Sequence, residues 1–455
     1  MADINQLVSK RCSRDINKIK ESQQNLVTDL LDKKLRDAAL VFCHDVAVAC
    51  CVAQDSTNDH GDLADGQIGP ALFLSAWHRF CRDEVALSAS RFLAEACLGQ
   101  LASKPMSLKW IDGITGTTWA LRRVLAQPDD SEIVDHDFSA AVDQALVHQL
   151  GAKEWHGHYD LISGLVGYGL YALEHPDHDW RERLASKVLH HLEALAQHSS
   201  TGITWLTRPE QLSETDRIAY PNGNHNLGLA HGVPGVIGFL ARCVEMNCYR
   251  KVAAALLVGA VDWMIAQNMR QAGKADSTAR EGFFGYVAGS DHPVRLAWCY
   301  CDLGICVVLL RAANALARDD WRSFALEVAR ENASRRNETH GVIDMGLCHG
   351  SAGAALIFLR LWQQSGEVTF ADACHFWLEK TLEMRRTDFN RTAGVYRADW
   401  KDGCRQYVGC IGYLTGAAGV GLAVLSCITG NVDAWDSPLL TDIPAVLIKS
   451  QETIL

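Results

Sequence analysis

Residues 345–358 read MGLCHGSAGAALIF, a polar turn that runs directly into an apolar segment. Gly350 and Gly353 are three residues apart, a spacing that suits a tight turn packed closely against the start of a helix. Cys348 and His349 stand just before them, and thiolates and imidazoles are common zinc ligands. Because adjacent residues do not share a helix face, these two side chains reach one metal ion only from a turn. A metal site here needs a third ligand from elsewhere in the chain.

The glycine pair followed by an apolar run occurs seven times. Each copy has two glycines three residues apart, except the fifth, where Cys301 stands in place of the first glycine. The first positions of the copies are 66, 113, 164, 232, 301, 350 and 416, so that successive copies lie 47, 51, 68, 69, 49 and 66 residues apart. Self-similarity at such intervals indicates one supersecondary unit repeated along the chain.

The sequence between the copies is mostly helical in pattern. Segments such as ERLASKVLHHLEALAQ and RSFALEVARENASR place apolar residues at three- and four-residue steps. Each repeat therefore predicts one amphipathic helix and one apolar helix that begins at the glycines. Units that cannot bury their apolar faces alone must stack, and a closed ring leaves no exposed end. The sequence predicts an all-α fold, an α/α toroid of about seven helical hairpins with the apolar helices inside, as one domain over residues 1–455.

One segment departs from the helical pattern. Residues 201–207, TGITWLT, favour a strand, and residues 221–224, PNGN, are typical of a turn. Both lie within the 68-residue step between the third and fourth copies. We expect a small, partly β insertion over residues 196–227, near the mouth of the ring.

The composition is that of an ordinary soluble globular chain. Its 455 residues are 48% hydrophobic and carry a formal net charge of −11, without a basic run or a basic–aromatic patch. Nucleic acid is therefore not an expected partner. The N-terminus lacks the apolar core of a signal peptide, and no stretch predicts a transmembrane segment. The 16 cysteines are scattered without a pattern and indicate reduced core thiols in a cytoplasmic protein.

Four of the seven glycine turns carry residues that can do chemistry. These residues are Asp160, His231, Arg295, Cys299, Tyr300, Cys348 and His349. In a closed ring such turns converge on one central cavity. Cys299, from the repeat next to Cys348 and His349, is then the missing third ligand. Three protein ligands leave a fourth position open, which distinguishes catalytic zinc from structural zinc.

Simpler interpretations stay open for single residues. Asp160 suits a helix N-cap, and His231 alone would be a core histidine. Arg295 could pair with a surface carboxylate, and Tyr300 could be a core aromatic residue. An α/α-toroid glycosidase is a further alternative, in which Asp160 and Asp302 supply the two carboxylates that such an enzyme needs. The cysteine and histidine set would then have no role.

Three segments, YPNGNHNLGLAHGVPG, RLAWCY and GLCHGSAG, resemble the signatures of the lanthionine cyclase family (LanC-type lanthipeptide cyclases) and occur in the same order. The resemblance covers nearly the whole chain. It implies a toroid with an inserted module similar to an SH2 domain, and one zinc ion per chain. The family usually has glycine at the position of Cys301, so this thiol is either a second sulfur near the metal or a tolerated change.

The resemblance also implies a role for each site residue. The zinc ligands are Cys299, Cys348 and His349, the acid/base residue is His231 with Asp160 as its partner carboxylate, and Arg295 and Tyr300 lie near the metal. Such an enzyme adds peptide cysteine thiols to dehydroalanine or dehydrobutyrine and forms (methyl)lanthionine rings. Zinc would hold the substrate thiol in the open position as a thiolate, and the histidine would protonate the resulting enolate.

The implied substrate is a dehydrated precursor peptide with a leader, and the implied partners are a dehydratase and an exporter. The implied location is the cytoplasm, with a place at the membrane face within a biosynthetic complex also open. Two alternatives keep the metal site. One is addition of glutathione to dehydroamino acids in proteins, as in eukaryotic relatives of the family. The other is a zinc-stabilised scaffold that binds the leader peptide without turnover.

Overall fold

The structure is a computed structural model that describes residues 30–52, 61–125, 137–270, 282–290, 295–336, 340–430 and 434–444. Both ends of the predicted 1–455 domain, residues 1–29 and 445–455, lie outside the described residues. No helix in the described ranges is long and apolar enough to cross a membrane.

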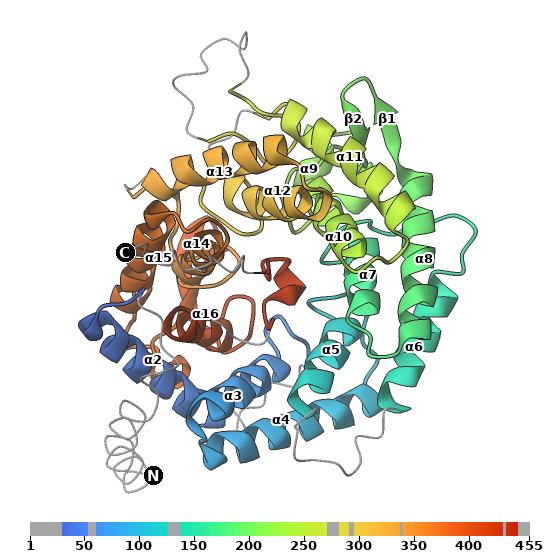
Figure 1. The fold of residues 1–455 in the computed structure, drawn as a ribbon. Coiled ribbons are helices and arrows are strands. Elements are labelled where there is room, and N and C mark those ends of the chain that lie inside the picture. Colours follow the sequence, from blue (N-terminus) through green and yellow to red (C-terminus); the bar gives the residue numbers. More distant parts are fainter. Residues whose placement is uncertain are drawn as a thin grey trace, which may run out of the picture.

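Two concentric rings of helices form the molecule (Figure 1). The inner ring consists of α3 (Ile68–Cys81), α5 (Ile114–Leu125), α7 (Leu165–Leu173), α10 (Val233–Glu245), α12 (Asp302–Leu316), α14 (Ser351–Ser365) and α16 (Ala417–Thr429). The outer ring consists of α2 (Lys33–Val52), α4 (Glu84–Ser103), α6 (Asp137–Gln149), α8 (His178–Leu195), α11 (Arg250–Ala266), α13 (Asp319–Ser334) and α15 (Val368–Glu383). The predicted toroid of seven hairpins is confirmed.

Burial separates the two rings as their sequences predict. In α12 every residue from Asp302 to Ala313 is buried, as expected for a helix enclosed on all sides. The outer helix α8 buries only one stripe, which includes Leu184, Val188 and Leu192. The ring closes because α16 packs against both α3 and α2, so that the first described helix completes the last hairpin.

The second glycine of each pair allows a close backbone approach. A Cβ atom on Gly304 would lie 2.1 Å from the carbonyl oxygen of Trp298, and one on Gly353 would lie 2.0 Å from that of Leu347. Real side chains do not reach such distances. The turn before each of these helices therefore folds back onto the first helical turn, and the residues between stand at its apex.

A closed circle of backbone hydrogen bonds joins the seven turns. In each repeat the carbonyl of the residue five positions before the second glycine accepts an N–H from the preceding repeat, at distances from 2.9 to 3.3 Å. The acceptors are Ala64, Ile111, Ile162, Ala230, Cys299, Cys348 and Leu414. Equivalent residues of neighbouring repeats are thus held in backbone contact around the mouth of the ring.

The segment between α8 and α10 contains the expected strands. β1 (Gln197–Ser199) pairs antiparallel with β2 (Gly202–Thr204), and the 3-10 turn η3 (Pro209–Gln211) and the short helix α9 (Glu214–Ala219) follow. Thr207 and Asn224 then form an isolated β-bridge, which brings the two sides of the segment together. The limits 196–227 and the likeness to an SH2 domain stay predictions.

A second hairpin lies between α15 and α16 and was not predicted. β3 (Tyr396–Lys401) pairs with β4 (Cys404–Gly409), and Asp402 and Gly403 between them have φ values of 51° and 76°. Asp-Gly at such positive φ is typical of a two-residue hairpin turn. This hairpin accounts for the length of the 66-residue step between the sixth and seventh glycine pairs.

The described C-terminal residues 434–444 lie in the middle of the ring (Figure 1, red). The indole nitrogens of Trp110 and Trp298 donate to the carbonyls of Pro438 and Leu439, at 3.2 and 2.7 Å. Trp110 belongs to the second repeat and Trp298 to the fifth. This segment therefore connects repeats that are far apart in the sequence.

Candidate active site

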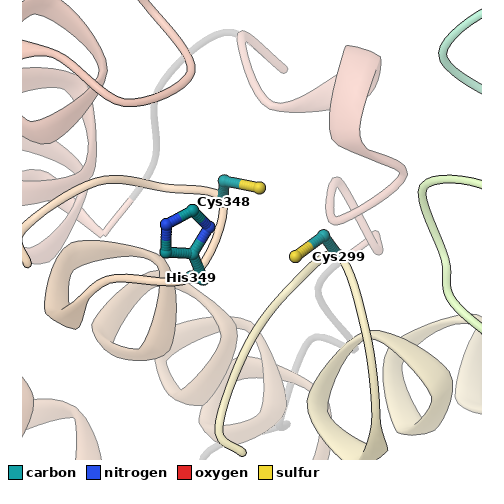
Figure 2. A group of neighbouring side chains, drawn as sticks. All are labelled: Cys299, Cys348 and His349. Atoms are coloured by element: carbon teal, nitrogen blue, oxygen red, sulfur yellow. The ribbon is translucent and has the colours of Figure 1, made fainter. Parts of the chain in front are cut away.

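Three predicted metal ligands come together at two neighbouring turns. The ligand atoms of Cys299, Cys348 and His349 all lie within 4.8 Å of one another. Cys299 precedes α12 and the other two residues precede α14; Figure 2 shows their side chains turned toward a common space. The two cysteines occupy equivalent positions of adjacent repeats, and the Cys299 N–H donates to the Cys348 carbonyl at 3.2 Å.

This donor set fits one zinc ion. Two thiolates and an imidazole are ligands that zinc prefers, and bonds of about 2.0–2.3 Å can span the three atoms after small side-chain rotations. In the part of the chain that the structure describes, no fourth Cys, His, Asp or Glu joins the group. These three residues therefore leave one position of a tetrahedral ion for a further ligand.

Cys301 is separate from this group. It is fully buried in a small apolar cluster with Met269, and Tyr286 and Tyr300 pack against it. Its backbone has φ 68° and ψ −160°, a conformation that is essentially restricted to glycine. The thiol thus occupies a strained backbone position beside the metal ligands.

This strain predicts an unusual order of stability at position 301. The Cys301→Gly variant should be more stable than Cys301→Ala by roughly 1–3 kcal/mol, because only glycine relieves the conformation. The free energy of unfolding from denaturant titration measures the difference. The same two substitutions at Cys306, inside helix α12, provide the control, since there alanine should be favoured by about 1 kcal/mol. Alanine at 301 as stable as glycine would contradict the strain.

The charges around the sulfur atoms favour an ionised Cys299. A hydrogen bond from Cys348 lowers the pKa of Cys299 well below its ordinary value, and the nearby Arg295 and His349 act in the same direction against burial. Arg295 Nη2 lies 3.6 Å from the Cys299 Sγ atom. Arg295 therefore lies beside the candidate ligand Cys299, and its role near a metal ion, which the family resemblance implies, stays a prediction.

His231 and Asp160 form a close pair at the mouth. His231 Nδ1 lies 2.8 Å from Asp160 Oδ2, and the other carboxylate oxygen accepts the Ser163 N–H at 2.7 Å. The Asp160 side chain is 5% exposed and that of His231 is 42% exposed, so the imidazole can meet a ligand. Burial disfavours the imidazolium, but the hydrogen bond and charge of Asp160 outweigh it and raise the pKa of His231.

Tyr300 directly follows Cys299 in the chain, and its ring lies close to that of His231. Its ring centroid is 6.3 Å from that of His231, and its hydroxyl accepts a hydrogen bond from Asn226 Nδ2 at 3.2 Å. Burial raises the pKa of Tyr300 to about 12, so the hydroxyl stays protonated at neutral pH. Asn226 was not among the residues predicted from the sequence, although it lies within the segment YPNGNHNLGLAHG.

Two further carboxylates near these turns, those of Asp302 and Asp344, are buried. Asp302 is fully buried and accepts from the Phe283 and Phe284 N–H groups and from Asn332, so it is not available to a sugar substrate. This argues against the glycosidase alternative. Asp344, which was not among the residues predicted from the sequence, lies 3.3 Å from His349 Nε2.

Comparison with known proteins supports the resemblance to the lanthionine cyclase family. The sequence model of the family described as Lanthionine synthetase C-like protein matches residues 57–440. The nisin biosynthesis protein NisC of Lactococcus lactis subsp. lactis is 26% identical over 214 residues, which cover 43% of this chain and 47% of that protein. The aligned part thus spans about half of that relative. The structure of a nisin cyclase matches with a TM-score of 0.69 over 88% of this chain and 96% of that one, at 18% identity, and supports the fold.

Proposed function

The chain belongs to the lanthionine synthetase C-like family, and from this premise we propose that it is a zinc-dependent lanthipeptide cyclase. It would add cysteine thiols of a dehydrated precursor peptide to dehydroalanine or dehydrobutyrine and close (methyl)lanthionine rings. The observation that carries the proposal is the joint placement of two features at one mouth. One is the group of Cys299, Cys348 and His349, and the other is the pair of His231 and Asp160.

The proposed ligands hold one zinc ion per chain. When bound there, zinc would supply positive charge that lowers the pKa of a peptide thiol and keeps it nucleophilic. Ring closure forms a bond between this sulfur and the β-carbon of the dehydroamino acid. The electron pair of the alkene moves to the α-carbon and its carbonyl, and the α-carbon then takes a proton. The thiol proton is lost to solvent. Since the peptide loses one proton from sulfur and gains one at the α-carbon, its mass does not change.

His231 is proposed as the acid that delivers the proton to the α-carbon. Its exposed imidazole faces the mouth, and Asp160 Oδ2 holds Nδ1 at 2.8 Å, so that Nε2 is the nitrogen left for the substrate. Arg295 is proposed to stabilise negative charge on the enolate oxygen, and the Tyr300 hydroxyl to help orient the peptide. A positioned acid contributes about 10²–10⁴-fold to a rate.

The proposed substrate and partners rest on the resemblance to the family. We propose a precursor peptide with a leader, a dehydratase that prepares it and an exporter that removes the product, with the cytoplasm as the place of reaction. The segment over residues 196–227 is proposed as an SH2-like module near the mouth of the ring.

Substrate choice tests the proposal. The purified protein is incubated with a synthetic peptide that contains one cysteine and one dehydroalanine, with and without glutathione. Ring closure leaves the mass unchanged and removes the thiol from alkylation, whereas glutathione addition raises the mass. We expect closure in both reactions. Glutathione addition alone would favour the glutathione alternative, and peptide binding without any addition would favour the scaffold.

The Asp160→Asn variant is expected to change the pH dependence of ring closure. Protonated His231 is the proposed acid, so the rate should fall as pH rises through its raised pKa. Without the carboxylate charge, burial dominates and the pKa of His231 drops. The alkaline limb of the pH–rate profile should therefore move to lower pH in a series between about pH 5 and 9. An unmoved limb would show that another group is the acid.

A further inference from the structure

Polar residues also recur at another position of the repeat, nine residues before its second glycine. In three repeats, residues at this position contact a residue four positions before a second glycine, in the same or the next repeat. The pairs are Asn226 with Tyr300 at 3.2 Å, Asp344 with His349 at 3.3 Å, and Cys410 with Thr415 at 3.5 Å. The repeat thus places one polar residue in contact with another, and Asp344 is the one that contacts a proposed metal ligand.

The Asp344 carboxylate is buried, and both of its oxygens have polar partners. Its side chain is 1% exposed. One oxygen accepts the N–H of Gly346 at 3.3 Å, and the other accepts the N–H of Ala398 at 3.1 Å and lies 3.3 Å from His349 Nε2. Ala398 belongs to β3, so the hairpin β3–β4 helps to hold this carboxylate in place.

We propose that Asp344 is the positioning residue of the metal centre. It accepts the Nε2–H of His349, which fixes the imidazole tautomer and leaves Nδ1 as the nitrogen for the metal. Figure 2 shows one ring nitrogen of His349 turned toward the space between Cys299 and Cys348 and the other turned away. The inference rests on the proposed zinc site and adds a residue to it.

A purely structural role for Asp344 is the competing explanation, because its first oxygen closes a turn before α14. Asn226 shows how the structural role can be distinguished from the positioning role. It occupies the equivalent position in the fourth repeat and makes the equivalent contact, from the Gly228 N–H to its Oδ1 at 2.8 Å. Asparagine therefore supports this turn, and Asp344→Asn should fold. The single amide oxygen cannot serve Gly346, Ala398 and His349 together, and an amide N–H facing Nε2 would favour the wrong tautomer.

The test measures zinc affinity rather than turnover. Zinc binding to purified wild-type and Asp344→Asn protein is measured by competition with a chromophoric chelator, and thermal unfolding is followed without metal. Asp143→Asn is the matched control, because Asp143 is equally buried and lies 3.2 Å from His175 Nε2, away from the metal group. We expect zinc to bind Asp344→Asn 10–100-fold more weakly than wild type, and Asp143→Asn to bind it as wild type does.

Each other result overturns the inference. Equal zinc affinity of Asp344→Asn and wild type would show that the carboxylate does not position His349, while the proposed zinc site would stand. An equal loss in Asp344→Asn and Asp143→Asn would trace the effect to general destabilisation. A wild-type protein that binds no zinc would overturn the proposed site and this inference with it.

Discussion

The His231→Asn variant is expected to close rings about 10²–10⁴-fold more slowly than wild type while it keeps its zinc. His231 belongs to the fourth repeat, whereas the proposed ligands belong to the fifth and sixth, so metal binding does not need it. Asparagine can still meet Asp160 but cannot deliver a proton at neutral pH. Mass spectrometry after thiol alkylation gives the rate, and elemental analysis gives the zinc content.

His158→Asn is the matched control for this experiment. His158 also faces Asp160, but its Nδ1 lies 3.9 Å from the Oδ2 atom, against 2.8 Å for His231. Its substitution should change the rate of ring closure only slightly. Loss of zinc in His231→Asn would make His231 a ligand. A wild-type rate in that variant would make it a packing residue, and the acid would be sought elsewhere, first at Tyr300.

The Cys348→Ala variant is expected to lose both zinc and ring closure. Two remaining ligands rarely hold zinc. The zinc affinity should therefore fall by more than the 10–100-fold that is typical when a residue hydrogen-bonded to a ligand is replaced. Zinc content after purification and the rate of thiol loss measure the two effects. Cys306→Ala, which removes a buried thiol inside α12, should keep both. Full zinc content in Cys348→Ala would remove Cys348 from the site.

The ring was predictable because its cause is local. A glycine pair at the start of an apolar run marks a helix that must approach a neighbouring backbone closely, and seven such marks predict seven inner helices. The proximity of Cys299 and Cys348 followed from the same register, since both stand five residues before a second glycine. The circle of backbone hydrogen bonds explains why equal positions in the sequence become neighbours in space.

Other features escaped prediction for physical reasons. Asn226 and Asp344 look like ordinary turn residues, and only their distance from the second glycine marks them as a set. The strands β3 and β4 are short and largely polar, although Asp402-Gly403 signalled their turn. The C-terminal segment has no local pattern that places it inside the ring. Its partners, such as Trp110, are hundreds of residues away.

Removal and return of the metal test the central claim most directly. The protein is depleted with a chelator and supplied again with zinc in steps, and ring closure on one dehydrated peptide is measured at each zinc content. The proposed function predicts no closure above background without metal, a rate proportional to bound zinc, and full recovery at about one zinc per chain. A depleted protein that closes rings at the wild-type rate would contradict a zinc-dependent cyclase.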